Sequence, residues 1–185
     1  MTYSPHTSAT ILPLGGATPQ LPESTFVAPG AVLVGDIQVG ENCSFWYHAV
    51  ARGDVGKIRL GDRVNVQDHS MIHMSDGKSN AEIGNDVTIG HRAVIHGATI
   101  KDRVLIGMGA IILDNAVIGE DSVVGADALV TGGKVFPPRS LILGSPAKVV
   151  KTLSDDEIAA LPKGAAHYVR IAQRHKDALN AQNNE

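Results

Sequence analysis

A six-residue repeat of apolar side chains is the feature that most constrains the fold of this chain. An aliphatic residue, in one case a phenylalanine, recurs at every sixth position in four blocks. These positions are Val27, Leu33, Val39, Phe45 and Ala51; Leu60, Val66 and Ile72; Ile83, Ile89 and Ile95; and Ile100, Ile106, Ile112, Ile118, Val124 and Val130. A period this regular is typical of a stacked-coil architecture, because each unit buries its apolar side only against its neighbours.

Each hexad is interpreted as a short strand followed by a corner. The aliphatic residue points inward, and a glycine often follows it, as at Gly84, Gly90 and Gly107, where the backbone needs freedom that bulkier residues lack. Three hexads close one triangular coil, and successive coils hydrogen-bond at a spacing of about 4.8 Å. The repeat therefore predicts an all-β solenoid, a parallel β-helix whose stability is nearly a sum over neighbouring coils.

Breaks in the period predict the loops and the domain boundaries. The segments 55–59 and 74–82 interrupt the hexads and contain polar residues and glycine, so both are expected to bulge from corners as loops. We predict an N-terminal extension over residues 1–25, a β-helix domain over 26–150, and a helical segment over 151–185 that packs on the β-helix.

The C-terminal segment has helical signals. Ser154 and Glu157 have the spacing of a capping box, and Pro162 and Gly164 are expected to divide the segment into two helical pieces. A stripe of residues at helical spacing is predicted to face the β-helix. Its members are Tyr168, Ile171, Ala172, His175 and Leu179.

Composition excludes several classes of partner. With 185 residues, 43% of them hydrophobic, the chain can build one domain, and its net charge of −3 offers no basic surface for nucleic acid or an anionic membrane. Cys43 is the single cysteine and cannot form an internal disulfide, which favours a reducing compartment. No targeting signal or bilayer-spanning run is apparent, so a cytoplasmic location is expected.

Three histidines are the candidate metal ligands. His73 and His96 each follow an inward residue, and they lie one coil apart if the 74–82 loop is an excursion, so their imidazoles should be close enough to share a metal ion. His91 follows Ile89 by two places, which puts it on a neighbouring face. A trimer would bring the His91 face of one chain against the His73/His96 face of the next, so we expect a metal site between subunits.

The same count places further polar residues near these histidines. Arg52 lies on the face of His73 and Asp68 on that of His91, which predicts an Arg52–Asp68 ion pair between chains. The amide of Gln67 would border the same cleft and could orient a metal-bound water. In the alternative interpretation of the triad, the histidines line a hydrated subunit interface. A separate alternative makes Arg52 and Asp68 purely structural even in a protein that binds the metal.

The motifs together resemble the gamma-class carbonic anhydrase family over Phe26 to Leu179. They are Arg52-Gly53-Asp54, the segment GDRVNVQD at 61–68, the three histidines, and Gly144-Ser145-Pro146-Ala147-Lys148. The resemblance implies a left-handed β-helix and a homotrimer with three intersubunit metal sites. It also implies the Arg52–Asp68 pair between subunits, Gln67 beside a metal-bound water, and reversible hydration of carbon dioxide to bicarbonate by a hydroxide held on the metal. Zinc suits three histidines with an open fourth position, and iron(II) or cobalt suit the same ligands.

The chain departs from the archaeal prototype of that family at its proton-relay carboxylates. The prototype has an acidic loop between its first two metal histidines and a glutamate after its Arg-x-Asp element. Here the loop offers only Asp76, and the second position is Val55. Asp76, His69 and Tyr168 are the candidates to replace the missing relay, and a metal-binding homologue with little hydratase activity is one alternative function.

The main alternative from another class is a hexapeptide-repeat acyltransferase or acyl-coenzyme A thioesterase. There a histidine acts as general base, and the GSPAK segment at 144–148 is compatible with it. A third alternative is a non-catalytic assembly or metal-storage protein. Three histidines at ligand spacing are not needed for acyl transfer, which favours the metalloenzyme.

Overall fold

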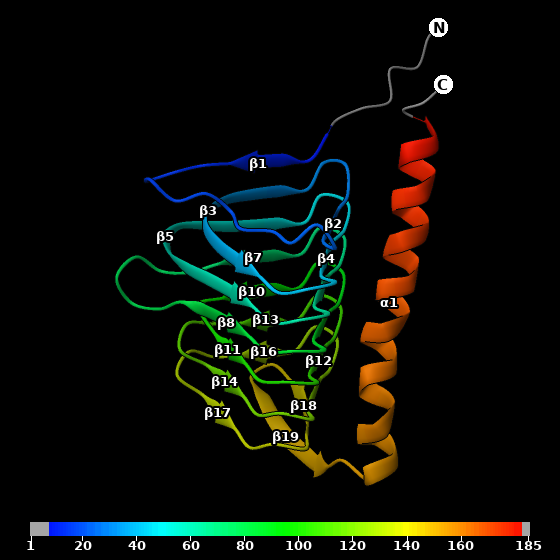
Figure 1. Ribbon diagram of the computed structural model, residues 1–185. Coiled ribbons are helices and arrows are strands. Elements are labelled where there is room, and N and C mark those ends of the chain that lie inside the picture. Colours follow the sequence, from blue (N-terminus) through cyan, green and yellow to red (C-terminus); the bar gives the residue numbers. More distant parts are fainter. Residues whose placement is uncertain (1–7, 183–185) are drawn as a thin grey trace, which may run out of the picture.

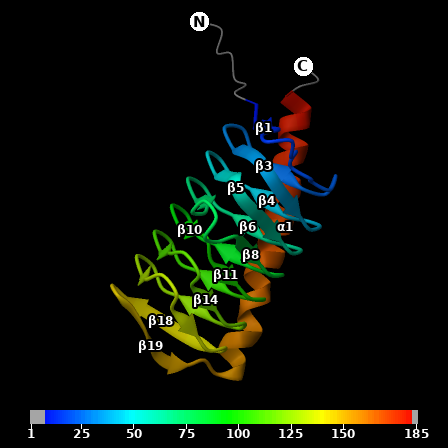
Figure 2. The ribbon, with the colours of Figure 1, turned by 90° about the vertical axis from the view of Figure 1, so that its left-hand side faces the viewer.

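The chain forms a stack of triangular coils with one helix along its side. The computed structural model describes residues 8–182 as a parallel β-solenoid of about seven turns and a single C-terminal helix (Figure 1). Turned by 90°, the coils lie one above another, and the helix runs the length of the stack (Figure 2). The expected parallel β-helix of hexapeptide repeats with a C-terminal α-helix is confirmed.

The coils have three faces, named here the histidine face, the third face and the helix face. The histidine face contains β1 (Thr10–Leu12), the first parts of β3 (Val32–Val39) and β5 (Val50–Leu60), β7 (Met71–His73), β10 (Val94–His96), β13 (Ile111–Ile112) and β16 (Leu129–Val130). The third face contains the second parts of β3 and β5, then β8 (Ala81–Ile83), β11 (Thr99–Ile100), β14 (Val117–Ile118) and β17 (Val135–Phe136). The helix face contains β2 (Phe26–Val27), β4 (Ser44–Phe45), β6 (Asn65–Val66), β9 (Thr88–Ile89), β12 (Leu105–Ile106), β15 (Val123–Val124) and β18 (Ser140–Gly144), and β19 (Ala147–Thr152) pairs antiparallel with β18.

The inward residues of the hexads form the core. Ile72, Ile95 and Ile112 lie in register on successive coils, and each is 0% exposed. The other hexad positions are buried in the same way, except for Val27, which is half-buried against the core. Cys43 is buried as predicted, and burial raises the pKa of its thiol to about 12.

The expected loop at 55–59 is wrong, because β5 continues through it as one strand that bends from the histidine face to the third face. Two glycines allow this bend. A Cβ on Gly35 would lie 2.3 Å from the carbonyl oxygen of Gly53, so β3 and β5 approach at the corner more closely than any side chain permits. The backbone therefore remains paired where the hexad period breaks.

The predicted loop at 74–82 and the predicted N-terminal extension differ less from the structure. The second interruption is a loop, residues 74–80, between β7 and β8, and the buried side chain of Met74 anchors its start. At the N-terminus, β1 pairs with β3 in parallel register. The solenoid therefore begins at Thr10, inside the segment expected to be an extension.

The C-terminal segment forms one helix, α1 (Asp155–Gln182), and the expected division into two pieces is wrong. The capping box is confirmed: the Glu157 amide donates to Ser154 Oγ at 3.3 Å, and the Ser154 amide donates to Glu157 Oε2 at 3.0 Å. Pro162 lies inside the helix, where packing of the buried residues Ala165 and Ala172 compensates for the backbone hydrogen bond that proline cannot make.

An aromatic cluster attaches α1 to the helix face. The ring of Trp46 meets Tyr168 edge-on at 5.5 Å and His175 at 5.0 Å between centroids, and Phe26 lies 5.3 Å from Trp46. A hydrogen bond of 2.8 Å joins the Tyr47 hydroxyl to Nδ1 of His175. The predicted stripe of the helix thus packs on the β-helix as expected.

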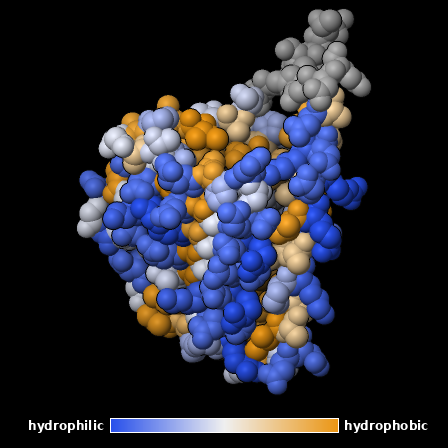
Figure 3. Space-filling view, viewed as in Figure 1, coloured by the Kyte–Doolittle hydropathy of each residue, from blue (hydrophilic) through white to orange (hydrophobic). Residues whose placement is uncertain are grey.

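Exposed apolar residues lie at both ends of the stack. At the first coil Ile11 and Leu12 are each 47% exposed, and at the last coil Val135 is 71% and Val150 54% exposed; hydrophobic patches are visible at both ends in Figure 3. Over residues 8–182, no helix combines the length and the apolar character needed to cross a membrane.

The stacked core yields a stability prediction. Ile112→Ala deletes a fully buried side chain between two coils, so we expect a loss of about 2–5 kcal/mol in the free energy of unfolding, measured by chemical denaturation. Val135→Ala is the control, because Val135 is 71% exposed and its truncation should cost far less. Equal losses in the two variants would contradict the assignment of the core.

Candidate metal centre

His73 and His96 form an imidazole pair on the histidine face. They are Cα partners in the parallel pairing of β7 with β10, one coil apart, and their ring centroids lie 5.3 Å apart. Both strands are held by rung-to-rung hydrogen bonds, such as that from the Gly97 amide to the His73 carbonyl at 2.8 Å. The predicted stacking of these two histidines is confirmed.

Each ring of the pair contacts one carboxylate. Nε2 of His73 lies 3.1 Å from Oδ1 of Asp54, and Nδ1 of His96 lies 3.1 Å from Oδ2 of Asp114. A carboxylate that accepts one ring N–H fixes the tautomer and leaves the lone pair on the opposite nitrogen. That arrangement is typical of metal-ligating histidines.

His91 has the same kind of partner but lies elsewhere on the coil. Its Nδ1 is 2.9 Å from Oδ2 of Asp68. It sits on the corner between β9 and β10, five residues before His96, which is the last residue of β10. Within residues 8–182 of one chain, no three His, Cys, Asp or Glu side chains are grouped so that they could hold a metal ion.

Arg52 joins the edge that carries the histidine pair. It follows Ala51, the register partner of Ile72, so it lies in line with His73 as predicted. Within the chain its guanidinium pairs with Asp54, while Asp68 contacts His91. Burial raises the pKa of Asp54, but hydrogen bonds from Arg52 and His73 outweigh it and leave the pKa below its ordinary value. The Arg52–Asp68 pair between subunits stays a prediction.

Asp114 is a site residue that the sequence analysis missed. Besides His96, it accepts hydrogen bonds from the Ser75 hydroxyl at 2.9 Å, the Ser75 amide at 3.3 Å and the Ser79 hydroxyl. Burial alone would raise the pKa of Asp114, but these hydrogen bonds and His96 lower it to about 2. The coil register could have revealed it. Ile95 pairs with Ile112, so Asp114 lies beside Gly97, the residue that follows His96.

Gln67 is fixed at the edge of the helix face. Its side chain is buried, and its amide nitrogen donates to Oδ1 of Asn65 at 3.0 Å. Asn65 in turn donates to the Thr88 hydroxyl at 2.9 Å on the next coil. One N–H of the Gln67 amide is therefore engaged, and its second N–H and its carbonyl oxygen have no hydrogen bond among residues 8–182.

Tyr168 brings α1 to the His91 edge. Burial raises the pKa of Tyr168, and the negative charge of Asp68 raises it further. The same two causes raise the pKa of Tyr47. The structure thus divides the predicted residues into two half-sites: Arg52, His73 and His96 at one edge of the histidine face, and Gln67, Asp68, His91 and Tyr168 at the other.

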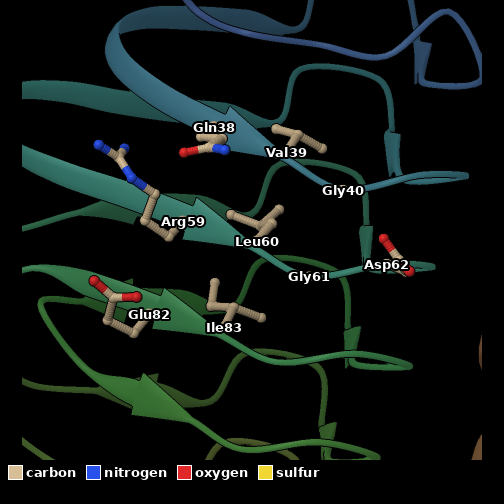
Figure 4. A pocket seen from close by; sticks show the side chains of 9 residues that line it. All are labelled: Gln38, Val39, Gly40, Arg59, Leu60, Gly61, Asp62, Glu82 and Ile83. Atoms are coloured by element: carbon tan, nitrogen blue, oxygen red, sulfur yellow. The ribbon is translucent and has the colours of Figure 1, made fainter.

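A hollow of about 410 Å³ on the third face contains none of these residues. Gln38, Arg59 and Glu82 project there from three successive coils, above a backbone that includes Gly40 and Gly61 (Figure 4). Arg59 is already paired with Asp36 at 2.7 Å. The hollow is therefore not part of the candidate metal centre, which lies on the histidine face.

The donor chemistry of the two half-sites fits a transition-metal ion. Three imidazoles, each backed by a carboxylate, offer the neutral nitrogen ligands that zinc, iron(II) and cobalt accept. His73 and His96 would supply two of them from one chain, and His91 would come from another.

The fold defines a hexapeptide-repeat β-helix protein, and its outer surface carries the paired histidines described above. The profile described as bacterial transferase hexapeptide (six repeats) matches residues 97–132. Among solved structures, the product of the BC4754 gene of Bacillus cereus superposes with a TM-score of 0.88 at 40% identity, over 92% of this chain and 98% of that one. A hexapeptide transferase family protein from Anaplasma phagocytophilum gives a TM-score of 0.83 at 36% identity, over 89% and 96% of the two chains.

Relatives of known name point to one family. The carbonic anhydrase of Geobacillus kaustophilus is 43% identical over 90% of this chain and 91% of its own length. The mitochondrial gamma carbonic anhydrase 2 of Arabidopsis thaliana is 37% identical over 90% of this chain, which spans only 62% of that relative. The chain belongs to the gamma carbonic anhydrase family.

The tyrosines at the His91 edge allow a pH test. Both pKa values are raised in the folded state, so their contribution to helix packing is present below the ordinary tyrosine pKa near 10 and is lost as the pH rises through the folded-state values. The Tyr3→Phe background leaves Tyr47 and Tyr168 as the two tyrosines of the chain. In it, Asp68→Asn should lower both ionisation midpoints, as measured by ultraviolet absorbance. Asp102→Asn, on another corner, should leave them unchanged; midpoints insensitive to Asp68→Asn would contradict the placement of Tyr168.

Proposed function

We propose that this chain assembles as a homotrimer with three metal ions between subunits and catalyses the reversible hydration of carbon dioxide to bicarbonate. The observation that carries the proposal is the division of the ligands. His73 and His96 lie at one edge of a face and His91 at the other, and each ring has one nitrogen within 3.1 Å of a carboxylate oxygen. A ring of three chains joins unlike edges at every interface and closes on itself.

The surface between the two half-sites supports self-association. An apolar column runs up the histidine face, with one outward residue from each coil in parallel register. Its members are Val32, Val50, Met71, Val94, Ile111 and Leu129. Met71 is 42% exposed and Ile111 is 39% exposed in the single chain, and burying apolar surface stabilises association by about 25 cal/mol per Å². A second copy of the same chain is the occupant we propose.

The proposed roles of the residues follow from their contacts. A divalent cation with an open position supplies Lewis acidity that makes hydroxide available from water at neutral pH. Hydrogen bonds to Asp54 and Asp114 hold His73 and His96 in the tautomers that can bind it, and Asp68 lies beside Nδ1 of His91 at 2.9 Å. The second N–H and the carbonyl oxygen of the Gln67 amide are available to orient a water. We keep zinc as the proposed cofactor, with iron(II) and cobalt as alternatives.

Proton exchange with solvent is the step for which the family's glutamates are missing. Asp76 is exposed at the tip of the 74–80 loop, and His69 is exposed beside Asp68, with its ring stacked on His48 at 5.2 Å between centroids. We keep Asp76 and His69 as the candidates for this step. The raised pKa of Tyr168 disfavours it as a proton carrier near neutral pH, so we assign that tyrosine to packing beside Asp68.

Acyl transfer or acyl-coenzyme A hydrolysis is the second candidate. It is favoured by the structural similarity to the Anaplasma hexapeptide transferase family protein. A metal-binding homologue with little hydratase activity is the third, because Val55 and the 74–80 loop lack the prototype's glutamates. A cytoplasmic location stays a prediction, supported by the single buried cysteine.

Subunit mixing tests the shared site. His91→Ala and His96→Ala homotrimers should each lose bound metal and hydratase activity, because each lacks one ligand in every site. Trimers reassembled from an equal mixture should regain about one quarter of the sites, since each intact site needs an unmutated residue from two chains. Metal analysis and stopped-flow hydration of carbon dioxide measure the two effects.

The matched control is His167→Ala, an exposed histidine of α1 outside both half-sites, which should keep full metal content. No recovery on mixing, although reassembly is shown by native mass spectrometry, would contradict a shared site. Thiol release from acyl-coenzyme A in the absence of hydration would favour acyl transfer instead.

A further inference from the structure

Asp114 connects two parts of the chain that are far apart in the sequence. Its Oδ2 lies 3.1 Å from His96 Nδ1 and 2.9 Å from the Ser75 hydroxyl. Its Oδ1 accepts from the Ser75 amide at 3.3 Å and from the Ser79 hydroxyl. One carboxylate therefore contacts a candidate metal ligand and both ends of the 74–80 loop.

The loop has few other attachments. Met74 is fully buried at its start, and at its end Oδ1 of Asn80 accepts a hydrogen bond from the Lys57 amide at 2.8 Å. Between them, Asp76, Gly77 and Lys78 are exposed. The hydrogen bonds from Ser75 and Ser79 to Asp114 therefore hold the two sides of the exposed loop tip to the coil.

The backbone leaves space for this contact at one position. A Cβ on Gly97 would lie 2.0 Å from the Ser79 hydroxyl oxygen and 2.3 Å from Oδ1 of Asp114. Gly97 also has φ +62°, in the left-handed region that favours glycine. The residue that follows His96 must therefore lack a side chain for the loop to reach Asp114.

We propose that Asp114 is a positioning residue that couples the 74–80 loop to His96, so that the position of the loop and the orientation of the imidazole are set together. The role in metal binding rests on the proposed function, whereas the coupling itself can be measured without metal. A carboxylate that receives several hydrogen bonds is held in one rotamer, and that rotamer then orients the histidine. Loosening the loop therefore loosens His96, although no loop side chain contacts it in the hydrogen bonds described.

The test separates the loop from the histidine. Ser75→Ala/Ser79→Ala removes the loop's donors and leaves the Asp114 carboxylate and His96 intact, whereas Asp114→Asn weakens both contacts. Asp102→Asn is the matched control, because Asp102 lies over Gly84 and accepts from the Asn85 amide at 2.8 Å on a different corner. The readouts are tryptic cleavage after Lys78, the ring ¹⁵N shifts of His96 in the metal-free protein, and the affinity for Co²⁺.

We expect the serine double variant to be cleaved about tenfold faster, because it loses hydrogen bonds to a charged acceptor. It should also show altered His96 shifts and bind Co²⁺ several-fold more weakly. Asp114→Asn should show all three effects at least as strongly, and Asp102→Asn none of them. Faster cleavage with unchanged His96 shifts, or no change in cleavage, would overturn the coupling.

Two further outcomes are distinguishable. Should the wild-type protein bind no Co²⁺, the proposed function fails, while cleavage and ¹⁵N shifts still decide the coupling. Should the double variant unfold, Ser75→Ala and Ser79→Ala are tested singly by the same readouts, and each is expected to change both cleavage and the His96 shifts.

Discussion

The backbone hydrogen bonds between successive coils are the interaction on which the rest of this structure depends. The Met71 amide donates to the Ala93 carbonyl at 2.9 Å, and the Gly97 amide donates to the His73 carbonyl at 2.8 Å. Together they set the parallel register that places His73 directly beside His96. A slip of one residue would turn every outward side chain into the core. The buried isoleucines therefore specify the positions of the imidazoles.

The triangular coil also places the candidate metal ligands at two separate edges. One flat face has two edges, and the candidate ligands are divided between them, with Asp54 and Asp114 at one edge and Asp68 at the other. Within residues 8–182, neither edge alone groups three side chains that could hold a metal ion. In the proposed trimer, metal binding and assembly are then linked, because an ion that bridges two chains stabilises the assembled form over separate chains.

Much of this architecture follows from local sequence, and the exceptions have identifiable causes. The period, once the interruption after His73 is treated as a loop, places Ile72 beside Ile95 and hence His73 beside His96. It fails at 55–59, because the contact between Gly35 and Gly53 that carries β5 around the corner depends on a second coil. The expected break at Pro162 is wrong for a related reason. Packing of α1 on the helix face, which local sequence does not reveal, lets the helix continue through the proline. Asp114 was missed because its partners are separated from it in sequence and meet it only once the coils are stacked.

The most direct test of the shared metal centre is anomalous diffraction across the zinc, iron and cobalt absorption edges, using crystals grown without added metal. The account predicts a single anomalous peak at each subunit interface, bonded to His73 and His96 of one chain and to His91 of its neighbour. Interfaces with no anomalous peak, or a peak bonded to histidines of one chain only, would contradict it.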